Sequence, residues 1–141
     1  MKKILVAIDN SPIAEKVITN AENLRKSIDG ECAIISVTDL AIDLSDSGFT
    51  AHELIHIDKN EREKFIKNLL EINNIVCDQL FFETGKHSQN ILDIARKWEA
   101  DIIIIGMNVR TRFENVLMGS VAQNIIRHSD IPVLIITSKN K

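Results

Sequence analysis

The sequence predicts an α/β fold in which a five-stranded parallel sheet is covered by helices on both faces. Short apolar runs rich in β-branched residues alternate with longer segments of helical period along the 141 residues. The runs show almost no polar alternation, which is typical of parallel strands buried on both sides. Strands that alternate with helices require right-handed crossovers, which place helices on both faces of one sheet. No linker, repeat or low-complexity tract interrupts the pattern, so we expect a single domain over residues 1–141.

Five segments have the composition of buried strands. They are, in chain order, residues 3–8, 32–37, 78–82, 101–106 and 132–137. The fourth segment, DIIIIG, is the clearest of them, because four β-branched apolar residues follow one another without a break.

The segments between these strands predict helices with recognisable starts. Ser11-Pro12 has the pattern of an N-cap followed by proline at the first helical position. Thr50 and Glu53 have the spacing of a capping box, so a second helix is expected to begin there. A third helix is expected to be capped by Ser88. The expected core stripe of the second helix consists of Leu54, Ile57, Phe65, Leu69 and Ile72.

The composition excludes several classes of protein. The formal net charge of −3, with scattered Lys and Arg, argues against a protein that binds nucleic acid. No stretch approaches the roughly 20 apolar residues of a membrane span, and Asp9 interrupts the first apolar run short of a secretory signal. Cys32 and Cys77 have no CxxC spacing, so we expect two buried thiols rather than a disulfide framework. These features predict a cytoplasmic protein.

A ligand site is expected beyond the carboxyl ends of the strands, where the strand order reverses. Asp9 ends the first strand, Val37 ends the second and Gly106 ends the fourth. Gly119-Ser120 opens the last helix, whose free N–H groups and dipole favour an anion. A carboxylate at this edge can bind a sugar hydroxyl, while the N-terminus of a helix at the same edge can bind a phosphate. The alternative is that Asp9 is a turn residue and Gly119 a loop glycine beside a helix cap.

Four stretches carry a resemblance to a known family: KKILVAIDNS, AIISVTD, ILDIARKWEADIIIIGM and GSVAQNIIRHSDIPVLII. Along nearly its whole length the chain resembles the universal stress proteins. The resemblance implies a Rossmann-like sandwich of the adenine nucleotide alpha hydrolase type, with strand order 3-2-1-4-5. It also implies a stress-response module that binds ATP or AMP, with magnesium if the ligand is ATP, and that has at most weak ATPase activity. By the same resemblance, Asp9 contacts the ribose or an associated metal and Val37 lines the adenine pocket.

The resemblance extends to a phosphate-binding loop. In nucleotide-binding members of the family, the loop has the pattern Gly-x-x-Gly, nine residues, then Gly-Ser or Gly-Thr. Here Gly106 matches the first glycine and Gly119 with Ser120 matches the final pair. Val121 continues the Gly-Ser-Val start of the last helix, so the resemblance adds it to the nucleotide-binding set.

The second glycine of that loop is replaced by Val109. A β-branched side chain resists both a positive φ angle and a close approach of the backbone to phosphate. Arg110 and Arg112 follow in the same loop and offer positive charge to a phosphate, unless they are solvated loop residues. The competing hypothesis is therefore a dimeric protein-interaction scaffold of the same family that binds no nucleotide. Val109 favours the scaffold, whereas the three matching loop residues favour nucleotide binding.

The strand order that the resemblance implies makes the last strand an edge. An apolar run such as VLII on an open edge is an aggregation hazard unless something covers it. We therefore expect a two-fold homodimer that pairs residues 132–137 across its axis, as the resemblance also implies.

Several catalytic motifs are absent or incomplete. His52-Glu53-Leu54-Ile55-His56 matches H-E-x-x-H, but the HxxGxxH extension that would supply a third zinc ligand does not follow. We expect no protease there, and whether His52 and His56 bind a metal at the surface stays open. His87 is expected on the surface. The sequence contains no nucleophile elbow and no P-loop.

Two further α/β plans fit the sequence less well. A receiver-like phosphoacceptor needs an acidic pair after the first strand and an aspartate at the end of the third, where this chain has Asp9-Asn10 and Glu83. A flavodoxin-type carrier needs a longer loop after the first strand to cradle its phosphate than residues 10–12 provide.

Overall fold

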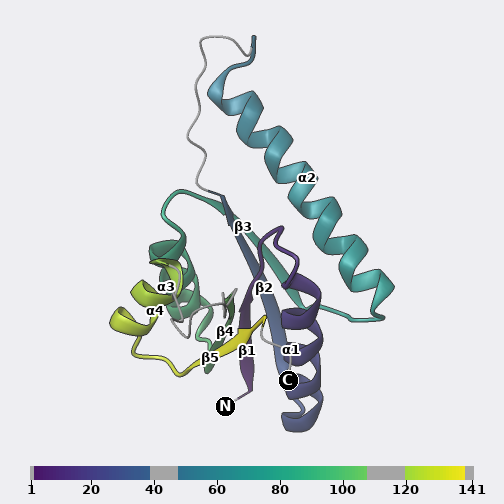
Figure 1. Ribbon diagram of the computed structural model, residues 1–141, viewed down its shortest axis with the longest axis vertical. Helices are drawn as coiled ribbons and strands as arrows, with labels where there is room; N and C mark the ends of the chain where they lie inside the picture. The colour runs from purple at the N-terminus through teal and green to yellow at the C-terminus, as the bar shows by residue number, and fades with distance from the viewer. Residues whose placement is uncertain (1, 39–47, 108–119, 139–141) are drawn as a thin grey trace, which may run out of the picture.

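The computed structural model describes residues 2–38, 48–107 and 120–138. Within these ranges, five strands and four helices alternate (Figure 1). The strands are β1 (Lys3–Ala7), β2 (Glu31–Thr38), β3 (Gln79–Thr84), β4 (Ile102–Met107) and β5 (Val133–Thr137). The helices are α1 (Ala14–Ile28), α2 (Ala51–Ile72), α3 (His87–Trp98) and α4 (Ser120–His128). Of the helices in the described ranges, none is long and apolar enough to cross a membrane.

The strands form one parallel sheet of order β3-β2-β1-β4-β5, which confirms the predicted fold class. β1 lies at the centre, where Leu5 is in register with Ala33 of β2 and with Ile103 of β4. The strand order therefore reverses between β1 and β4. This reversal is the point at which open α/β sheets form their ligand crevices.

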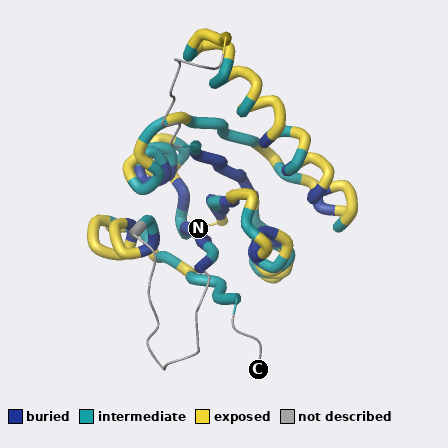
Figure 2. Tube along the Cα trace, turned by 45° about the horizontal axis from the view of Figure 1, so that its top comes forward, coloured by how far each residue is buried: buried dark blue, intermediate teal, exposed yellow. Residues whose placement is uncertain are grey.

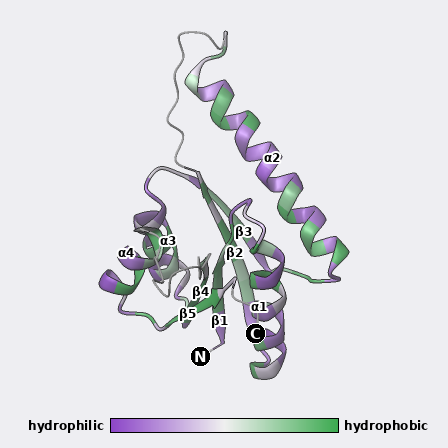
Figure 3. Cartoon of the chain, in the orientation of Figure 1, coloured by the Kyte–Doolittle hydropathy of each residue, from purple (hydrophilic) through white to green (hydrophobic). Residues whose placement is uncertain are grey.

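The two faces of the sheet build two apolar cores. Helices α1 and α2 cover one face and α3 and α4 cover the other (Figure 1). Successive strand residues point to opposite faces, so Ile4 and Val6 pack in the first core while Leu5 packs in the second. Figure 3 shows hydrophobic, green segments in the sheet, as expected for inner strands covered on both faces, with hydrophilic colour at the start of β1.

The helix starts differ from the predicted caps in two of three cases. α1 begins at Ala14 rather than after Ser11, because residues 11–13 form a turn in which the Ser11 carbonyl accepts the Ala14 N–H (3.1 Å). α3 begins at His87, with no side-chain cap from Lys86 or from the predicted Ser88. The cap of α2 is confirmed, since the Thr50 hydroxyl oxygen accepts the Glu53 N–H at 3.1 Å.

The buried face of α2 matches the predicted stripe only in part, since Leu69 is buried and Phe65 packs against the first core. Ile57 and Ile72 are 42% and 65% exposed, so both predictions were wrong. Leu69 is buried as predicted, and the other buried residues of α2 are Arg62, Ile66 and Leu70. Figure 1 shows the N-terminal part of α2 extending past the end of the sheet, and Figure 2 shows its exposure. Ile57 is exposed because it lies in the part of α2 that extends past the sheet, whereas Ile72 is exposed as the last residue of the helix.

The buried Arg62 fastens α2 to the sheet. Its guanidinium donates to the Ser36 carbonyl (2.7 Å) and hydroxyl (2.9 Å) on β2, and to the Asp58 carboxylate (2.8 Å) within α2. It also lies 5.7 Å from the centre of the Phe82 ring on β3. A buried guanidinium is stable only when its donors are satisfied, and these contacts meet that condition.

Candidate functional site

A pocket of about 330 Å³ opens at the carboxyl ends of β1, β2 and β4. Its walls come from those strands and from the first turns of α1, α3 and α4. Four residues of the sequence-predicted set, Asp9, Val37, Gly106 and Val121, line this one pocket. The pocket lies at the reversal of strand order and has the volume of a small-molecule site.

Asp9 stands at the mouth of the pocket, directly after β1. The ladder between β1 and β2 continues past the strand, since the Ile8 N–H donates to the Ile35 carbonyl at 3.0 Å. This bond fixes the backbone that carries Asp9. The Asp9 side chain is exposed, and its Oδ1 accepts the Ser11 N–H at 3.0 Å. An exposed carboxylate held in this way can accept further hydrogen bonds from ligand hydroxyls.

Gly106 forms part of the pocket floor and is required there by packing. A Cβ at this position would lie 2.7 Å from Cγ2 of Val17 and 3.2 Å from Cγ2 of Ile13. Glycine therefore allows α1 to approach β4 closely beneath the pocket. The buried side chain of Val37, on β2, also lines the pocket.

Two helices begin at the pocket. α4 starts at Ser120, and Val121 and Ala122 of its first turn line the wall. The first N–H groups of a helix have no partners within it, and with the dipole they give that end a partial positive charge. α3 starts at His87, which also lines the pocket.

His87 is the pocket residue that the sequence analysis missed. It was expected on the surface without a role, whereas the structure places it in the pocket lining. The turn that delivers it, from Thr84 to Lys86, contains Gly85 at φ 124°. The signal that was available is position: His87 follows the third strand just as Asp9 follows the first.

Other predicted residues lie outside the pocket or outside the described part of the chain. Arg110 and Gly119 fall in residues 108–119, which the structure does not describe. His52 and His56 are exposed on the first turns of α2, a helix that contributes no described lining to the pocket. Within the described ranges, no three His, Cys, Asp or Glu side chains converge as a metal site would require.

The described part of the pocket combines three kinds of surface. Its inner part is apolar and is made by Ile35, Val37, Ile91 and Ile105. Its mouth carries the Asp9 carboxylate, and its wall includes the start of α4. This arrangement suits a ligand with a flat apolar group at one end, hydroxyl groups in the middle and an anion at the other end.

The fold and the pocket define an open-sheet α/β protein with a ligand site at the reversal of strand order. More particularly, the chain belongs to the universal stress protein family, whose model matches residues 1–137. Universal stress protein MJ0531 of Methanocaldococcus jannaschii is 28% identical over 99% of this chain and 84% of its own length. Universal stress protein Sll1388 of Synechocystis sp. is 27% identical over 95% of this chain and 96% of its own length.

Solved structures share the fold along the whole chain. Protein MJ0577 of Methanocaldococcus jannaschii superposes with a TM-score of 0.80 at 28% identity, covering 99% of this chain and 98% of its own. The universal stress protein of Archaeoglobus fulgidus, solved in complex with dAMP, has a TM-score of 0.65 at 24% identity, covering 96% and 97%. A universal stress protein in complex with cAMP has a TM-score of 0.60 at 16% identity, covering 98% of each chain. The last two similarities show the fold.

Proposed function

We propose that the pocket binds an adenine nucleotide, ATP or AMP, and that the protein acts as a nucleotide-binding module in a stress response. The observation that carries the proposal is the assembly of Asp9, Val37, Gly106 and Val121 around one pocket. These residues come from four elements that are far apart in the sequence. The family supports the same reading, since two structural neighbours were solved with dAMP and with cAMP.

The three surfaces of the pocket match the three parts of a nucleotide. The adenine packs on the apolar part beside Val37, and the ribose hydroxyls donate to the Asp9 carboxylate. The phosphates point to the start of α4, where Ser120 and Val121 supply N–H groups. In this proposal Gly119 and Arg110 complete the phosphate site, although Val109 replaces the second glycine of the family pattern.

Magnesium would accompany ATP rather than occupy a site of its own. Mg²⁺ prefers oxygen ligands and is commonly held by one or two carboxylates together with substrate phosphates. Asp9 is the one carboxylate in the described lining of the pocket, and it fits that role.

The proposed activity is binding, with at most weak hydrolysis. Of the described lining residues, only Asp9 and His87 have ionisable side chains. Hydrolysis requires a group that positions and deprotonates water next to the phosphates. In the proposed pose Asp9 is engaged with the ribose or with magnesium, and the pocket contains no second carboxylate among the residues described.

Calorimetric titration with Mg-ATP and with AMP tests the proposal. Asp9→Ala removes the hydroxyl acceptor and should weaken binding about tenfold, which is roughly 1.4 kcal/mol. Val121→Glu places a negative charge in the first turn of α4. An acidic side chain there stabilises the helix through its dipole, but it repels the phosphates of the nucleotide. Val121→Gln is the matched control, because it has the same shape without the charge, so Glu should weaken Mg-ATP binding far more than Gln.

The absence of binding would favour the scaffold. If protein shown to be free of co-purified nucleotide gives neither heat nor a thermal shift with Mg-ATP or AMP, the nucleotide-binding proposal fails. The dimeric protein-interaction scaffold would then be the better account of the family membership.

We further propose that the protein is a homodimer paired through residues 132–137. β5 is the last strand in the sheet order and is paired with β4 on one side only in the described sheet. Leu134 on this strand is exposed. A second copy would cover an apolar edge that is otherwise an aggregation hazard. Light scattering should give twice the mass of the chain, and a monomer at working concentration would refute the dimer.

We also assign the protein to the cytoplasm. The chain has two cysteines, and both are free thiols, as expected for a protein of a reducing compartment. Cell fractionation with a periplasmic or secreted marker tests the assignment, and recovery with that marker would overturn it.

A further inference from the structure

The two cysteines of the chain lie next to each other at the amino edge of the sheet, opposite the pocket. β2 pairs with β3 so that Ala33 is in register with Gln79, which places Cys32 opposite Asp78 and beside the preceding Cys77. The Cys77 sulfur lies 3.4 Å from the carbonyl oxygen of Cys32. The two thiols are near enough for each to be the first cause of the shifted pKa of the other. Residues separated by the whole of α2 therefore form a dithiol.

The backbone around this pair is fixed by Asp78. The Asp78 N–H donates to the Cys32 carbonyl at 3.0 Å. In the opposite direction, the Cys32 N–H donates to Oδ2 of Asp78 at 2.9 Å. These two bonds hold the start of β2 against the segment that carries Cys77. The proximity of the two thiols is therefore fixed by the backbone.

The two thiols differ in exposure. Cys32 is 1% exposed and belongs to the core between the sheet and helices α1 and α2. Cys77 is only partly buried and packs against the same core from the turn between α2 and β3. A reagent from solvent therefore meets Cys77 first, and Cys32 is reachable mainly through Cys77.

The thiols also differ in acidity. The interaction with the Cys32 thiol is the first cause that lowers the pKa of Cys77 below its ordinary value. The interaction with the Cys77 thiol, and then burial, raise the pKa of Cys32. The neighbouring carboxylates of Glu22 and Asp78 add to the raised pKa of Cys32. The first proton therefore leaves from the more exposed sulfur, and a thiolate is the form that reacts with oxidants.

We propose that Cys32 and Cys77 form a reversible redox site that closes into an intramolecular disulfide when the protein meets hydrogen peroxide. The Cys77 thiolate attacks one peroxide oxygen, the O–O bond breaks, and hydroxide leaves from what becomes a sulfenic acid. The Cys32 sulfur then attacks the Cys77 sulfur, and the S–O bond breaks. The departing hydroxyl takes the Cys32 proton and leaves as water. The two thiols lose two electrons, and the peroxide is reduced.

The geometry favours a disulfide over other uses of the pair. The Cys77 sulfur lies 3.4 Å from the Cys32 carbonyl oxygen, so the two residues are close enough for a small rotation of the side chains to bring sulfur to sulfur. A structural zinc site needs four ligands, and within the described ranges no group of three or more ligating side chains is present. Of the two thiols, one is reactive and the other is held beside it as the resolving partner.

The test begins with the unmodified, fully reduced protein. Treatment with hydrogen peroxide should take the chain from two titratable thiols to none, with a mass loss of two hydrogen atoms. A non-reducing peptide map should link residue 32 to residue 77 within one chain. The rate should not depend on protein concentration, because both sulfurs belong to the same molecule, and dithiothreitol should restore both thiols. Addition of oxygen atoms at Cys77 without a link, or links only between chains, would overturn the proposal.

Single variants assign the two roles. In Cys77→Ser, the remaining thiol is buried and should resist peroxide. In Cys32→Ala, peroxide should leave a sulfenic acid at Cys77 that dimedone traps, because the resolving sulfur is missing. Equal reactivity of the two single variants would refute the assigned roles. Both variants should titrate nucleotide like the unmodified protein, since the pair lies at the edge opposite the pocket, and this separates the outcome from that of the proposed nucleotide site.

Discussion

The two edges of the sheet are built on different principles. At the amino edge, α1, α2 and α3 are each followed within two residues by a residue with positive φ, namely Asp29 (51°), Asn74 (53°) and Glu99 (62°). In each case the next N–H returns to the helix, at 2.9, 2.9 and 2.8 Å. This is the Schellman pattern, which satisfies carbonyls that a helix end would otherwise leave open. At the carboxyl edge, helix starts and an exposed carboxylate surround a pocket instead.

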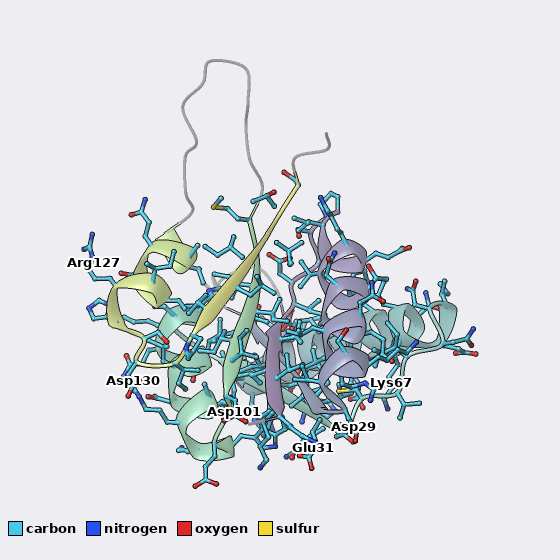
Figure 4. All side chains as sticks on the ribbon, turned by 90° about the horizontal axis from the view of Figure 1, so that it is seen from below. Asp29, Glu31, Lys67, Asp101, Arg127 and Asp130 are labelled. Carbon is cyan, nitrogen blue, oxygen red and sulfur yellow. The ribbon has the colours of Figure 1, made fainter. Side chains whose placement is uncertain are left out.

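The charges follow the same division. Figure 4 labels Asp29, Glu31 and Asp101 together at the amino edge, where they line a shallow hollow with Lys2, Lys3 and Glu99. The Lys3 N–H donates to the Asp101 carboxylate at 2.9 Å, and the Lys3 ammonium lies 5.0 Å from the centre of the Trp98 ring. This hollow has no apolar floor for a heterocycle. At the amino edge, the backbone and charged groups bind to one another and stabilise the fold. At the carboxyl edge, the N–H groups at the helix starts and the Asp9 carboxylate stay available for a ligand.

The largest expected effect is at the amino edge. A Cβ on Gly30 would lie 2.6 Å from the Lys2 carbonyl oxygen, which belongs to the backbone and cannot turn away. Gly30→Ala should therefore lower the free energy of unfolding by about 2–3 kcal/mol and leave nucleotide affinity unchanged. Urea unfolding and calorimetry measure the two quantities. The exposed neighbour Ser27→Ala serves as control and should change stability by less than about 0.5 kcal/mol.

Gly106→Ala tests whether the two edges really differ in role. Gly106 lies at the carboxyl edge, where the ligand is proposed to bind, yet it is also tightly packed against α1. Its added Cβ would push on Val17 and Ile13, which are side chains rather than backbone. We expect a loss of about 1–2 kcal/mol of stability together with weaker nucleotide binding, since the same atoms line the pocket. Lost stability with unchanged binding would show that the floor of the pocket is not part of the nucleotide site.

A smaller effect is expected from Glu22→Gln, in the second half of α1. Both Glu22 oxygens accept from the Arg25 guanidinium at 2.7 Å, and this contact lowers the pKa of Glu22 below its ordinary value of 4.5. The substitution should cost roughly 1–2 kcal/mol at neutral pH. A lowered carboxyl pKa contributes stability above pH 4.5, and this contribution disappears as the pH falls through the folded-state value. Unfolding curves of the two proteins should therefore converge on acidification, and a constant gap would contradict the assignment.

The smallest effect is a gain. Glu99 adopts φ 62°, a conformation that costs a side-chain-bearing residue roughly 1 kcal/mol and costs glycine almost nothing. Glu99→Gly should raise the free energy of unfolding by about 0.5–1 kcal/mol without changing nucleotide affinity. Glu99→Ala is the matched control, since it removes the same carboxylate but keeps the Cβ. An equal gain from both variants would point to charge rather than backbone strain.

The sheet and most of the pocket were predictable because they follow from local patterns. Continuous β-branched runs identify buried parallel strands, and parallel strands place their carboxyl ends at one edge. The strand pattern alone therefore predicts that Asp9, Val37 and Gly106 lie at one edge of the sheet. Their roles toward a nucleotide stay a proposal, and Arg110 and Gly119 fall outside the described residues.

The unpredicted features depend on how distant segments meet. The contact between Cys32 and Cys77 requires the register of β2 on β3, which no spacing in the sequence reveals. The burial of Arg62 requires that the carboxyl end of β2, which contains Ser36, lie under the middle of α2. His87 was missed because a histidine at a helix start resembles any surface residue until the pocket beside it is known.

The overhang of α2 has a consequence for the way the helix opens. The helix has 22 residues and is about 33 Å long, yet all of its buried residues lie between Arg62 and Leu70. None of residues 51–61 is fully buried, and a helical segment of that length is marginal in water without extensive packing. Amide hydrogens in this segment should exchange with deuterium through local fraying from the Thr50 cap. Amide hydrogens after Arg62 should exchange only when the sheet itself unfolds. The two parts of one continuous helix should therefore differ in their protection against hydrogen exchange.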